Sequence, residues 1–451
     1  MTRRPLKALA VAAALAAPAA ASGGEGVAPD VAQWEGPHEA PVYFIRADEL
    51  PIVDIKVVLD AGSARDGDAP GLARLTARSL DQGADGLDAD ELARRLEDTG
   101  ARLSTSAGRD RARIHLRSLA EADARDAATA LLERILETPS FPAEAVDRQR
   151  RQMLQRLRTQ RQSAADVGER ALYRAMYGDH PYAQPPSGTE AGLDGLDSEA
   201  VAAFHDTYYT APNAGIAIVG DLERAEAEAV AERLLHALGD GEAAPALPAP
   251  PEEPARTEVR IEHPSSQTAL LMGQPVVARG EEALAYPLRV ANQALGGRGM
   301  VSRLHQAMRE DRGLSYSTAS LLRIDSVRGP WIVRSTVQAD RDEEALQVLR
   351  GELERLAEAG LDEDEVAEAV RHLTGSLPVA LASNAALVRE LGTMAAYGLP
   401  ADHLARYIPR MEAVTPDAIR EALDARLDLE RMVTVLVGPG LEDADREVEA
   451  P

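Results

Sequence analysis

Apolar residues along this chain recur either at every second position or at every third to fourth position, which predicts strands and helices respectively. In the first half the pattern predicts strands at 42–46, 52–60, 103–107, 111–119 and 215–220, and helices at 71–80, 90–99, 120–138 and 143–178. The second half starts the order again, with strands at 257–261, 268–277, 317–323 and 331–338, and helices at 281–295, 341–359 and 362–375.

Both halves also close in the same way, which supports an internal repeat. The segment Leu196–Val201 opens a short helix that leads to an apolar strand ending at Gly220, and Val414–Ile419 does the same before a strand ending at Gly438. We therefore expect an α+β fold of two homologous domains, with mixed, largely antiparallel sheets packed with helices, that together form a clam.

The boundaries of these domains follow from composition. Residues 239–256 are rich in proline and predict a stiff, extended linker. The N-terminal domain is expected at 41–238 and the C-terminal domain at 257–440. A flexible leader is expected at 22–40 and an acidic, frayed tail at 441–451.

Residues 1–21 have the pattern of a secretory signal peptide. Arg3, Arg4 and Lys7 precede an apolar run that is too short to span a bilayer, and small residues offer a cleavage site near Ala21–Ser22. No later stretch of the sequence is long and apolar enough for a transmembrane helix. We expect a periplasmic or secreted protein after cleavage of this segment.

Composition removes several classes of chemistry. The 451 residues include no cysteine, which excludes disulfides, thiolate metal ligands and a cysteine nucleophile. The formal net charge of −25 disfavours binding to nucleic acid. A basic run at 148–161 lies within a predicted helix, where a solvated face is the simplest interpretation.

Common catalytic and metal motifs are absent from the sequence. No two of the nine histidines lie within five residues of each other, so no two-histidine helical zinc motif exists and a relocated metal site is disfavoured. The serine motif Gly-x-Ser-x-Gly is missing. The run Gly296–Gly299 lacks the Lys-Ser/Thr ending of a phosphate-binding loop.

One stretch, residues 296–317, predicts a glycine turn, an amphipathic helix, a glycine stop and a strand. Val301, Leu304 and Met308 are expected on one apolar helix face. Gly313 should end that helix, and the strand should place Leu314, Tyr316 and Thr318 on one side. This arrangement could direct Arg309 and Tyr316 into one cavity, although a helix-end arginine and a core tyrosine would give the same pattern.

Short motifs spread over nearly the whole chain carry a resemblance to a known family. In the first half they are Gly62–Asp66, Gly71–Ala73, Leu92 to Ala101, Pro139–Phe141, Gly178–Tyr182, Gly188–Glu190, Phe204, Tyr208–Tyr209 and Val219–Asp221. In the second half they are Gly296–Gly297, Ser302–Leu304, Arg309–Glu310 and Gly313–Ser317. Their order and spacing resemble the pitrilysin/insulinase family of zinc peptidases, in its short bacterial branch.

The resemblance implies that the zinc site of this family has been lost here. Members carry His-x-x-Glu-His after the Gly-Leu-Ala element, and a glutamate some seventy residues later completes the ligand set. The motif positions in this chain are Arg74, Ala77 and Arg78, and the distant position falls near Gln155, within 153–156. Two cations in place of two histidines should repel a metal ion. We expect no zinc and no other metal or cofactor in this chain.

The resemblance also implies a role for the second half. Family members use an arginine and a tyrosine of the C-terminal domain to hold the substrate backbone and the oxyanion, and Arg309 and Tyr316 match these positions. Some bacterial members work as pairs in which one chain carries the zinc and the other carries this pair. The chain is thus expected to be the non-metal subunit of a heterodimeric zinc endopeptidase, with a zinc-motif-bearing paralogue as partner and unfolded peptide as substrate. An inactive scaffold or peptide-binding protein of the same fold is the alternative.

Overall fold

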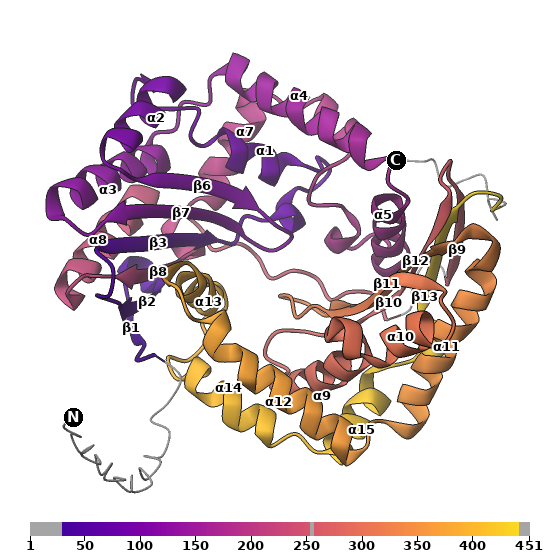
Figure 1. Ribbon diagram of the computed structural model, residues 1–451. Helices are drawn as coiled ribbons and strands as arrows, with labels where there is room; N and C mark the ends of the chain where they lie inside the picture. Colours follow the sequence, from indigo (N-terminus) through magenta and orange to yellow (C-terminus); the bar gives the residue numbers. More distant parts are fainter. Residues whose placement is uncertain (1–28, 253–256, 442–451) are drawn as a thin grey trace, which may run out of the picture.

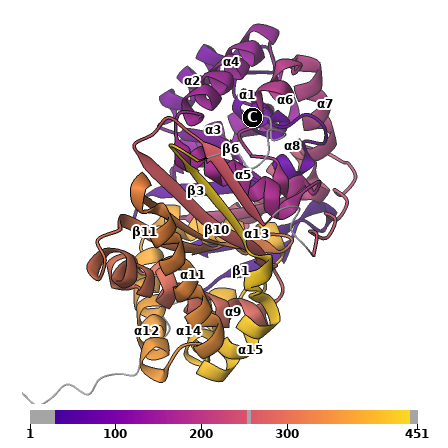
Figure 2. The same ribbon diagram turned by 90° about the vertical axis from the view of Figure 1, so that its right-hand side faces the viewer.

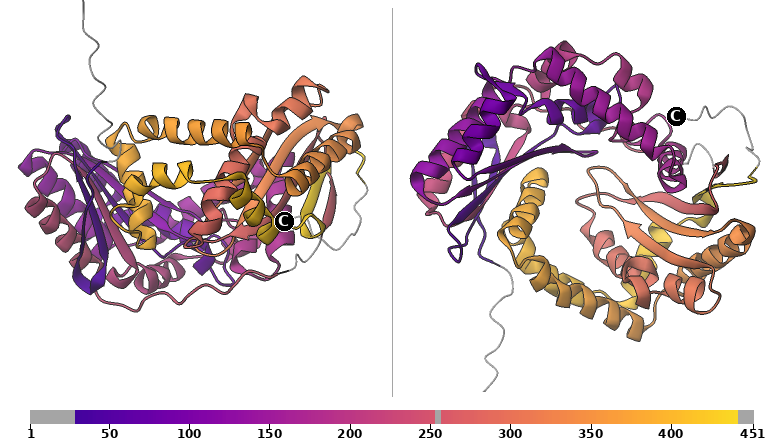
Figure 3. Two further views of the ribbon diagram at one scale, coloured as in Figure 1. Left: turned by 90° about the horizontal axis from the view of Figure 1, so that it is seen from below. Right: turned by 45° about the horizontal axis from the view of Figure 1, so that its top comes forward.

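The computed structural model describes residues 29–252 and 257–441, which form two lobes. We call residues 29–238 the N lobe and residues 257–441 the C lobe. Figure 1 shows the N lobe in indigo and magenta and the C lobe in orange and yellow. In Figure 3 the lobes curve toward each other, as expected for a clam.

The N lobe is built on a six-stranded sheet with the order β1-β2-β8-β3-β7-β6. Its strands are β1 (Ala32–Glu35), β2 (Pro41–Arg46), β3 (Ile52–Leu59), β6 (Arg102–Ala107), β7 (Ala112–Leu119) and β8 (Ala214–Gly220). A separate pair of short strands, β4 (Gly83–Ala84) and β5 (Leu87–Asp88), lies outside this sheet. Every residue of β8 is buried, because this strand lies inside the sheet with both faces covered.

The C lobe repeats this architecture with a five-stranded sheet of order β11-β12-β10-β13-β9. Its strands are β9 (Glu258–Glu262), β10 (Gln267–Val277), β11 (Ser315–Leu322), β12 (Gly329–Gln338) and β13 (Val433–Gly438). The strands β2, β8, β3, β7 and β6 correspond in order to β9, β13, β10, β12 and β11. The first pair is parallel in each lobe and the other pairs are antiparallel. The predicted repeat of two α+β domains is confirmed.

Helices pack on these sheets. The N lobe has α1 (Leu72–Ser79), α2 (Ala89–Asp98), α3 (Ala122–Glu137), α4 (Ala143–Gln160), α5 (Ala164–Tyr177), α6 (Glu190–Asp194), α7 (Ser198–Tyr208) and α8 (Arg224–Leu238). The C lobe has α9 (Glu282–Asn292), α10 (Arg303–His305), α11 (Asp342–Ala359), α12 (Glu363–Ala380), α13 (Asn384–Tyr397), α14 (His403–Glu412) and α15 (Pro416–Arg426). None of these helices is long and apolar enough to cross a membrane.

Three expectations about these elements are wrong. The single helix predicted at 143–178 is two helices, because Ser163 accepts a hydrogen bond from the Asp166 backbone N–H and starts a new helix. The helix predicted at 362–375 extends to Ala380, and α13 and α14 follow it without having been predicted. The stretch 22–40, predicted as a leader, contains β1, which pairs with β2 and so belongs to the sheet. The predicted signal peptide and most of the acidic tail lie outside the described residues.

The lobes exchange helices. α5 of the N lobe packs on β10 and β13 of the C lobe, and α13 of the C lobe packs on β3 and β8 of the N lobe. Figure 1 shows α12 and α14 running alongside each other and carrying α13 across to the indigo sheet, and Figure 2 shows α12, α14 and α15 at the opposite end of the molecule from α2 and α4. A side chain at Gly215 of β8 would lie 2.7 Å from the Ala395 carbonyl oxygen, so this contact requires glycine.

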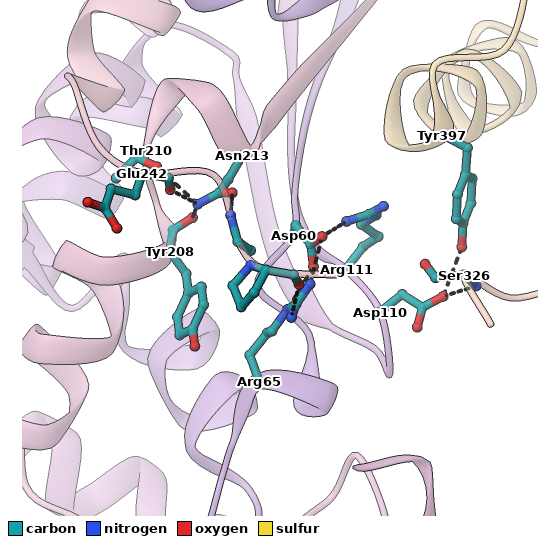
Figure 4. A network of polar contacts seen from close by, with 12 residues as sticks. Asp60, Arg65, Asp110, Arg111, Tyr208, Thr210, Asn213, Glu242, Ser326 and Tyr397 are labelled. Carbon is teal, nitrogen blue, oxygen red and sulfur yellow. Dashed lines mark hydrogen bonds and ion pairs between the residues drawn. The ribbon is translucent and has the colours of Figure 1, made fainter. Parts of the chain in front are cut away.

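A polar junction also joins the lobes (Figure 4). The Asp110 carboxylate, in the loop between β6 and β7, accepts hydrogen bonds from the Tyr182 hydroxyl, the Tyr397 hydroxyl at 3.0 Å and the Ser326 backbone N–H at 2.8 Å. Tyr397 and Ser326 belong to the C lobe. Burial of Asp325 in this junction and the charge of Asp110 raise the pKa of Asp325 to about 6.

The described part of the linker, residues 239–252, contains no helix or strand and is fastened to the N lobe (Figure 4). Arg65 donates to the Pro245 carbonyl oxygen at 2.6 Å while its guanidinium pairs with Asp60. The Asn213 side chain accepts from the Ala244 backbone N–H at 2.6 Å and donates to the Glu242 carbonyl oxygen at 3.2 Å. These contacts hold the connection between the lobes in one path.

Candidate functional site

The C-lobe part of the candidate site begins where α9 ends. The glycine turn predicted at the start of 296–317 begins later than Gly296: α9 continues into a π-helical segment at Gln293–Gly297, and the turn follows at Arg298 and Gly299. A side chain at Gly296 would lie 2.4 Å from the Ser320 backbone nitrogen, so glycine here allows the helix end to approach β11. π-helical turns interrupt the regular helix and are frequent at functional sites.

The segment that carries Arg309 is also irregular. The Ser302 side chain accepts from the His305 backbone N–H and starts α10, and a second π-helical segment, Gln306–Glu310, places Arg309 in its last turn. Leu304 and Met308 are fully buried as predicted, but Val301 is exposed because it lies in a preceding 3-10 turn. Gly313 then adopts φ = +60°, the left-handed conformation expected at a helix end.

Tyr316 lies in a β-bulge, which the predicted alternation missed. Ser315 pairs with Val337 of β12, and Ser317 pairs with the adjacent residue of β12, Thr336. Tyr316 therefore has no cross-strand partner. The Ser315 hydroxyl donates to the Thr336 carbonyl oxygen at 2.8 Å and accepts from the Ser317 backbone N–H at 3.2 Å. The bulge thereby turns Tyr316 away from the buried face that holds Leu314 and Thr318.

The structure brings Arg309 and Tyr316 together. The Arg309 guanidinium carbon lies 4.5 Å from the centre of the Tyr316 ring, a cation–π contact. The Tyr316 side chain is 81% exposed and the Arg309 side chain is 35% exposed, so the pair lies on the surface and not in the cavity that we expected. The nearest carboxylate to the guanidinium is Glu310, at 3.9 Å. Both groups therefore remain able to donate hydrogen bonds to a ligand.

The N-lobe part of the candidate site lies on α1. The Asp66 carboxylate accepts from the backbone N–H groups of Gly71 at 2.7 Å and Ala73 at 2.8 Å, and so fixes the start of this helix. Gly188 lies against the same turn, where a side chain would come within 2.7 Å of the Gly71 Cα. The Gly-Leu-Ala and Gly-Thr-Glu elements of the sequence thus pack directly on each other to position α1.

The motif positions on α1 have cationic or inert side chains. Arg74 and Arg78 are half-buried and lie one turn apart on one face, and Ala77 is buried. Arg78 Nη2 donates to Gln149 Oε1 at 2.6 Å and to Gln152 Oε1 at 2.9 Å, both on α4. A guanidinium offers no lone pair to a metal ion, so these residues do not fit zinc. Within 29–252 and 257–441, no group of three His, Asp or Glu side chains is placed to hold a metal.

The distant position expected within residues 153–156 of α4 includes both Gln155 and Arg156, which are both exposed. Gln155 lies about 120° around the helix axis from Gln149. Arg156, seven residues after Gln149, continues the face of α4 that carries Gln149 and Gln152, the partners of Arg78. Its charge, after burial, lowers the pKa of both Arg74 and Arg78. Arg156 therefore faces the motif arginines, and the correspondence of Gln155 to the distant ligand stays a prediction.

Sequence reasoning included Arg156 in the window 153–156 but singled out Gln155 within it. Arg156 belongs to the basic run at 148–161, where charge alone suggested a solvated face. The spacing of Gln149, Gln152 and Arg156 was available as a signal, because residues at these intervals share one side of a helix. Knowledge that α1 packs on this side was needed to use it.

The fold and the site together define a two-lobed, peptidase-like protein with arginine at the positions where the sequence led us to expect metal ligands in a zinc peptidase. Residues 42–190 match the family described as Insulinase (Peptidase family M16), and residues 195–373 match the Peptidase M16 inactive domain. The chain belongs to this family. The second match begins before the linker, within the N lobe.

Individual relatives agree with this assignment. The crystal structure of a peptidase M16 inactive domain from Pseudomonas fluorescens is 34% identical, with a TM-score of 0.87, over 91% of this chain and 98% of that chain. An uncharacterized zinc protease of Streptomyces coelicolor is 28% identical, over 61% of this chain and 61% of that protein. The periplasmic protease PqqL of Escherichia coli shares the fold, with a TM-score of 0.72 at 16% identity, over 93% of this chain and 46% of PqqL.

Proposed function

We propose that this chain is the non-metal subunit of a heterodimeric, periplasmic zinc endopeptidase that cleaves unfolded peptides. It supplies Arg309 and Tyr316, while a paralogous subunit with an intact zinc motif supplies the metal, the water and the general base. The observation that carries the proposal is the asymmetry between the lobes. The C lobe exposes a stacked Arg309–Tyr316 pair, and the N lobe has arginine where a metal ligand is needed.

The chemistry of this pair suits a peptide hydrolysis step. Attack of water on a peptide carbonyl places negative charge on its oxygen, and the tetrahedral intermediate is stabilised by hydrogen-bond donors aimed at that oxygen. A guanidinium and a phenol are such donors, and the cation–π contact holds them in one arrangement before substrate arrives. The pair binds and orients the substrate, and it moves no proton.

Peptide binding by strand addition fits the same architecture. β6 and β11 are outermost strands in their sheets, so each has an edge whose backbone groups can pair with an extended peptide. Main-chain pairing favours unfolded substrates over folded ones. A periplasmic location is supported by the expected signal peptide and by the family relationship to a protease whose name places it in the periplasm.

Reconstitution tests the proposal. The purified chain is mixed with a paralogue that carries His-x-x-Glu-His, and hydrolysis of a quenched fluorogenic unfolded peptide is measured together with the zinc content of each subunit. We expect activity only in the mixture and zinc only in the partner. Absence of a complex, or one zinc held tightly by this chain alone, contradicts the proposal. A complex that keeps full activity when Arg309 and Tyr316 are both replaced would identify this chain as a scaffold instead.

A further inference from the structure

Three arginines converge where the helices α1 and α4 meet. Arg74 and Arg78 share one face of α1, and Arg156 follows Gln149 and Gln152 on the facing side of α4. Arg78 connects the two helices, because its Nη2 donates to both glutamine side chains. Arg78 is thus held between the two helices, and Arg74 and Arg156 lie on the helix faces that it connects.

Arg74, Arg78 and Arg156 have no acidic partner among the described residues, unlike most arginines on and directly after α4; Arg148 donates to Gln82 instead. Arg150 and Arg151 both pair with Asp147, and Arg158 and Arg161 approach Glu190. In the described part of the chain, no carboxylate forms an ion pair or hydrogen bond with the three clustered arginines, which we call the arginine triad: Arg74, Arg78 and Arg156. Arg78 Nε is also buried without a hydrogen-bond partner.

An uncompensated group of like charges is unfavourable for folding. Burial, followed by the charge of Arg156, lowers the pKa of Arg74, and the same two causes lead for Arg78. Asp81 raises the pKa of Arg78, but its effect is smaller than those of burial and of the two neighbouring arginines, which lower it. An anion with two or more acceptor oxygens would accept hydrogen bonds from the free N–H groups and would also balance the positive charge.

We infer that the arginine triad is a binding site for a carboxylate group of a peptide. Where zinc would have held an oxygen of the substrate, guanidinium groups now accept an anionic oxygen pair directly. The carboxylate is either the C-terminus of the peptide or an acidic side chain. The peptide nature of the ligand rests on the proposed function, whereas the need for an anion rests on the triad alone.

The charge of the whole chain favours a single carboxylate over a polyanion. The net charge of −25 repels nucleic acid and other polyanions as they approach. A local site is screened from the distant surface charges at physiological salt, so a short-range contact with one carboxylate is still favourable. Arg156 is exposed, which leaves the triad open to a ligand from solution.

Fluorescence anisotropy with three labelled peptides tests this inference on the intact chain. The first is a neutral unfolded peptide with a free C-terminal carboxylate, the second is its C-terminal amide, and the third is the amide with one internal glutamate. We expect the first or the third peptide to bind at least about tenfold more tightly than the second. A charge-assisted, bidentate contact between a guanidinium and a carboxylate is strong enough to give this difference in affinity. The peptide that gains affinity identifies the source of the carboxylate.

Matched variants assign the effect to the triad. The Arg74→Gln/Arg156→Gln variant should bind all three peptides equally, while Arg158→Gln, an exposed arginine on the same helix, should keep the difference. The double variant should melt at the same or a higher temperature, because like charges have been removed. Equal binding of all three peptides to the unchanged chain, or a difference that persists in the double variant, overturns the inference.

This experiment is independent of turnover. It measures binding to the isolated chain, so a failed reconstitution with a zinc-bearing partner leaves its result intact. Conversely, loss of the peptide preference in the double variant with full activity of the reconstituted enzyme would confirm the site and separate it from the catalytic pair.

Discussion

The two lobes have the same strand order and opposite chemical contents. In the N lobe, α1 follows β3 and carries Arg74, Ala77 and Arg78. It is a regular α-helix whose start is fixed by Asp66. In the C lobe, the corresponding helix α9 ends in a π-helical segment, and a second π-helical segment and a β-bulge present Arg309 and Tyr316. The lobe with arginines at the expected ligand positions has regular geometry, whereas the lobe that we propose to act has irregular backbone.

The difference teaches that a fold can keep its architecture after one of its sites has changed. The contacts that position α1 come from Asp66, Gly71 and Gly188, none of which is a ligand position. Replacement of the ligands therefore leaves the helix in place. Irregular backbone in the C lobe is harder to explain by stability alone, since bulges and π-turns disrupt regular hydrogen bonding.

The largest effect is expected where the lobes depend on each other. Leu391→Ala in α13 and Leu172→Ala in α5 each remove a fully buried side chain from an exchanged helix. Each should lower the free energy of unfolding by about 2–5 kcal/mol, measured by urea denaturation, and unfolding should stay a single transition. Val379→Ala in α12, where the side chain is 79% exposed, is the control. Two separate transitions in either leucine variant would show that the lobes are independent.

The catalytic comparison can be sharpened by variants of the pair in the reconstituted enzyme. Tyr316→Phe keeps the ring beneath Arg309 but removes the hydroxyl donor, and turnover should fall by about 10²–10³. Arg309→Ala should have a similar effect, while Arg312→Ala, three residues further along, should have little. The two losses should combine to less than their product because the residues are in contact. Unchanged turnover in both single variants would remove the proposed roles.

A metal site rebuilt in the N lobe can show which α4 residue faces α1. Arg74→His and Arg78→His combined with Arg156→Glu should bind zinc at least about tenfold more tightly than the same histidine pair combined with Gln155→Glu. The reason is that Arg156 shares the face of α4 that carries Gln149 and Gln152, the partners of Arg78, whereas Gln155 is turned away from Gln149. Isothermal titration calorimetry with zinc measures the two affinities. Equal affinities, or tighter binding with Gln155→Glu, would favour Gln155 as the distant position.

The smallest effect is expected at the junction between the lobes. The pKa of Asp325 is raised to about 6, so the folded state prefers its protonated form. Its contribution to stability is complete below about pH 4, the ordinary pKa of aspartate, and is lost as the pH rises through about 6. Asp325→Asn should therefore raise the melting temperature at pH 7.5 by about 1 °C, or about 1 kcal/mol, and leave it unchanged at pH 4. A lower melting temperature of the variant at pH 7.5 would contradict this sign.

The sequence by itself determined the repeat, the family and the residues at the motif positions. Strand patterns of period two and helix patterns of period 3.6 are local, so they identified most elements and the order that the two halves share. The presence of Arg74 and Arg78 at the expected ligand positions is also visible in the sequence, and a guanidinium offers no lone pair to a metal ion in any fold.

Only the tertiary structure decided how these elements act on one another. The exchange of α5 and α13 leaves no local pattern, since a helix buries the same apolar face against either sheet. The bulge at Tyr316 is decided by the register against β12, where Ser315 pairs with Val337 and Ser317 with Thr336, and it reverses the face that alternation predicts. The role of Arg156 depends on which side of α4 contacts α1. In each case the deciding contact joins residues that are distant in the chain, and local periodicity carries no information about it.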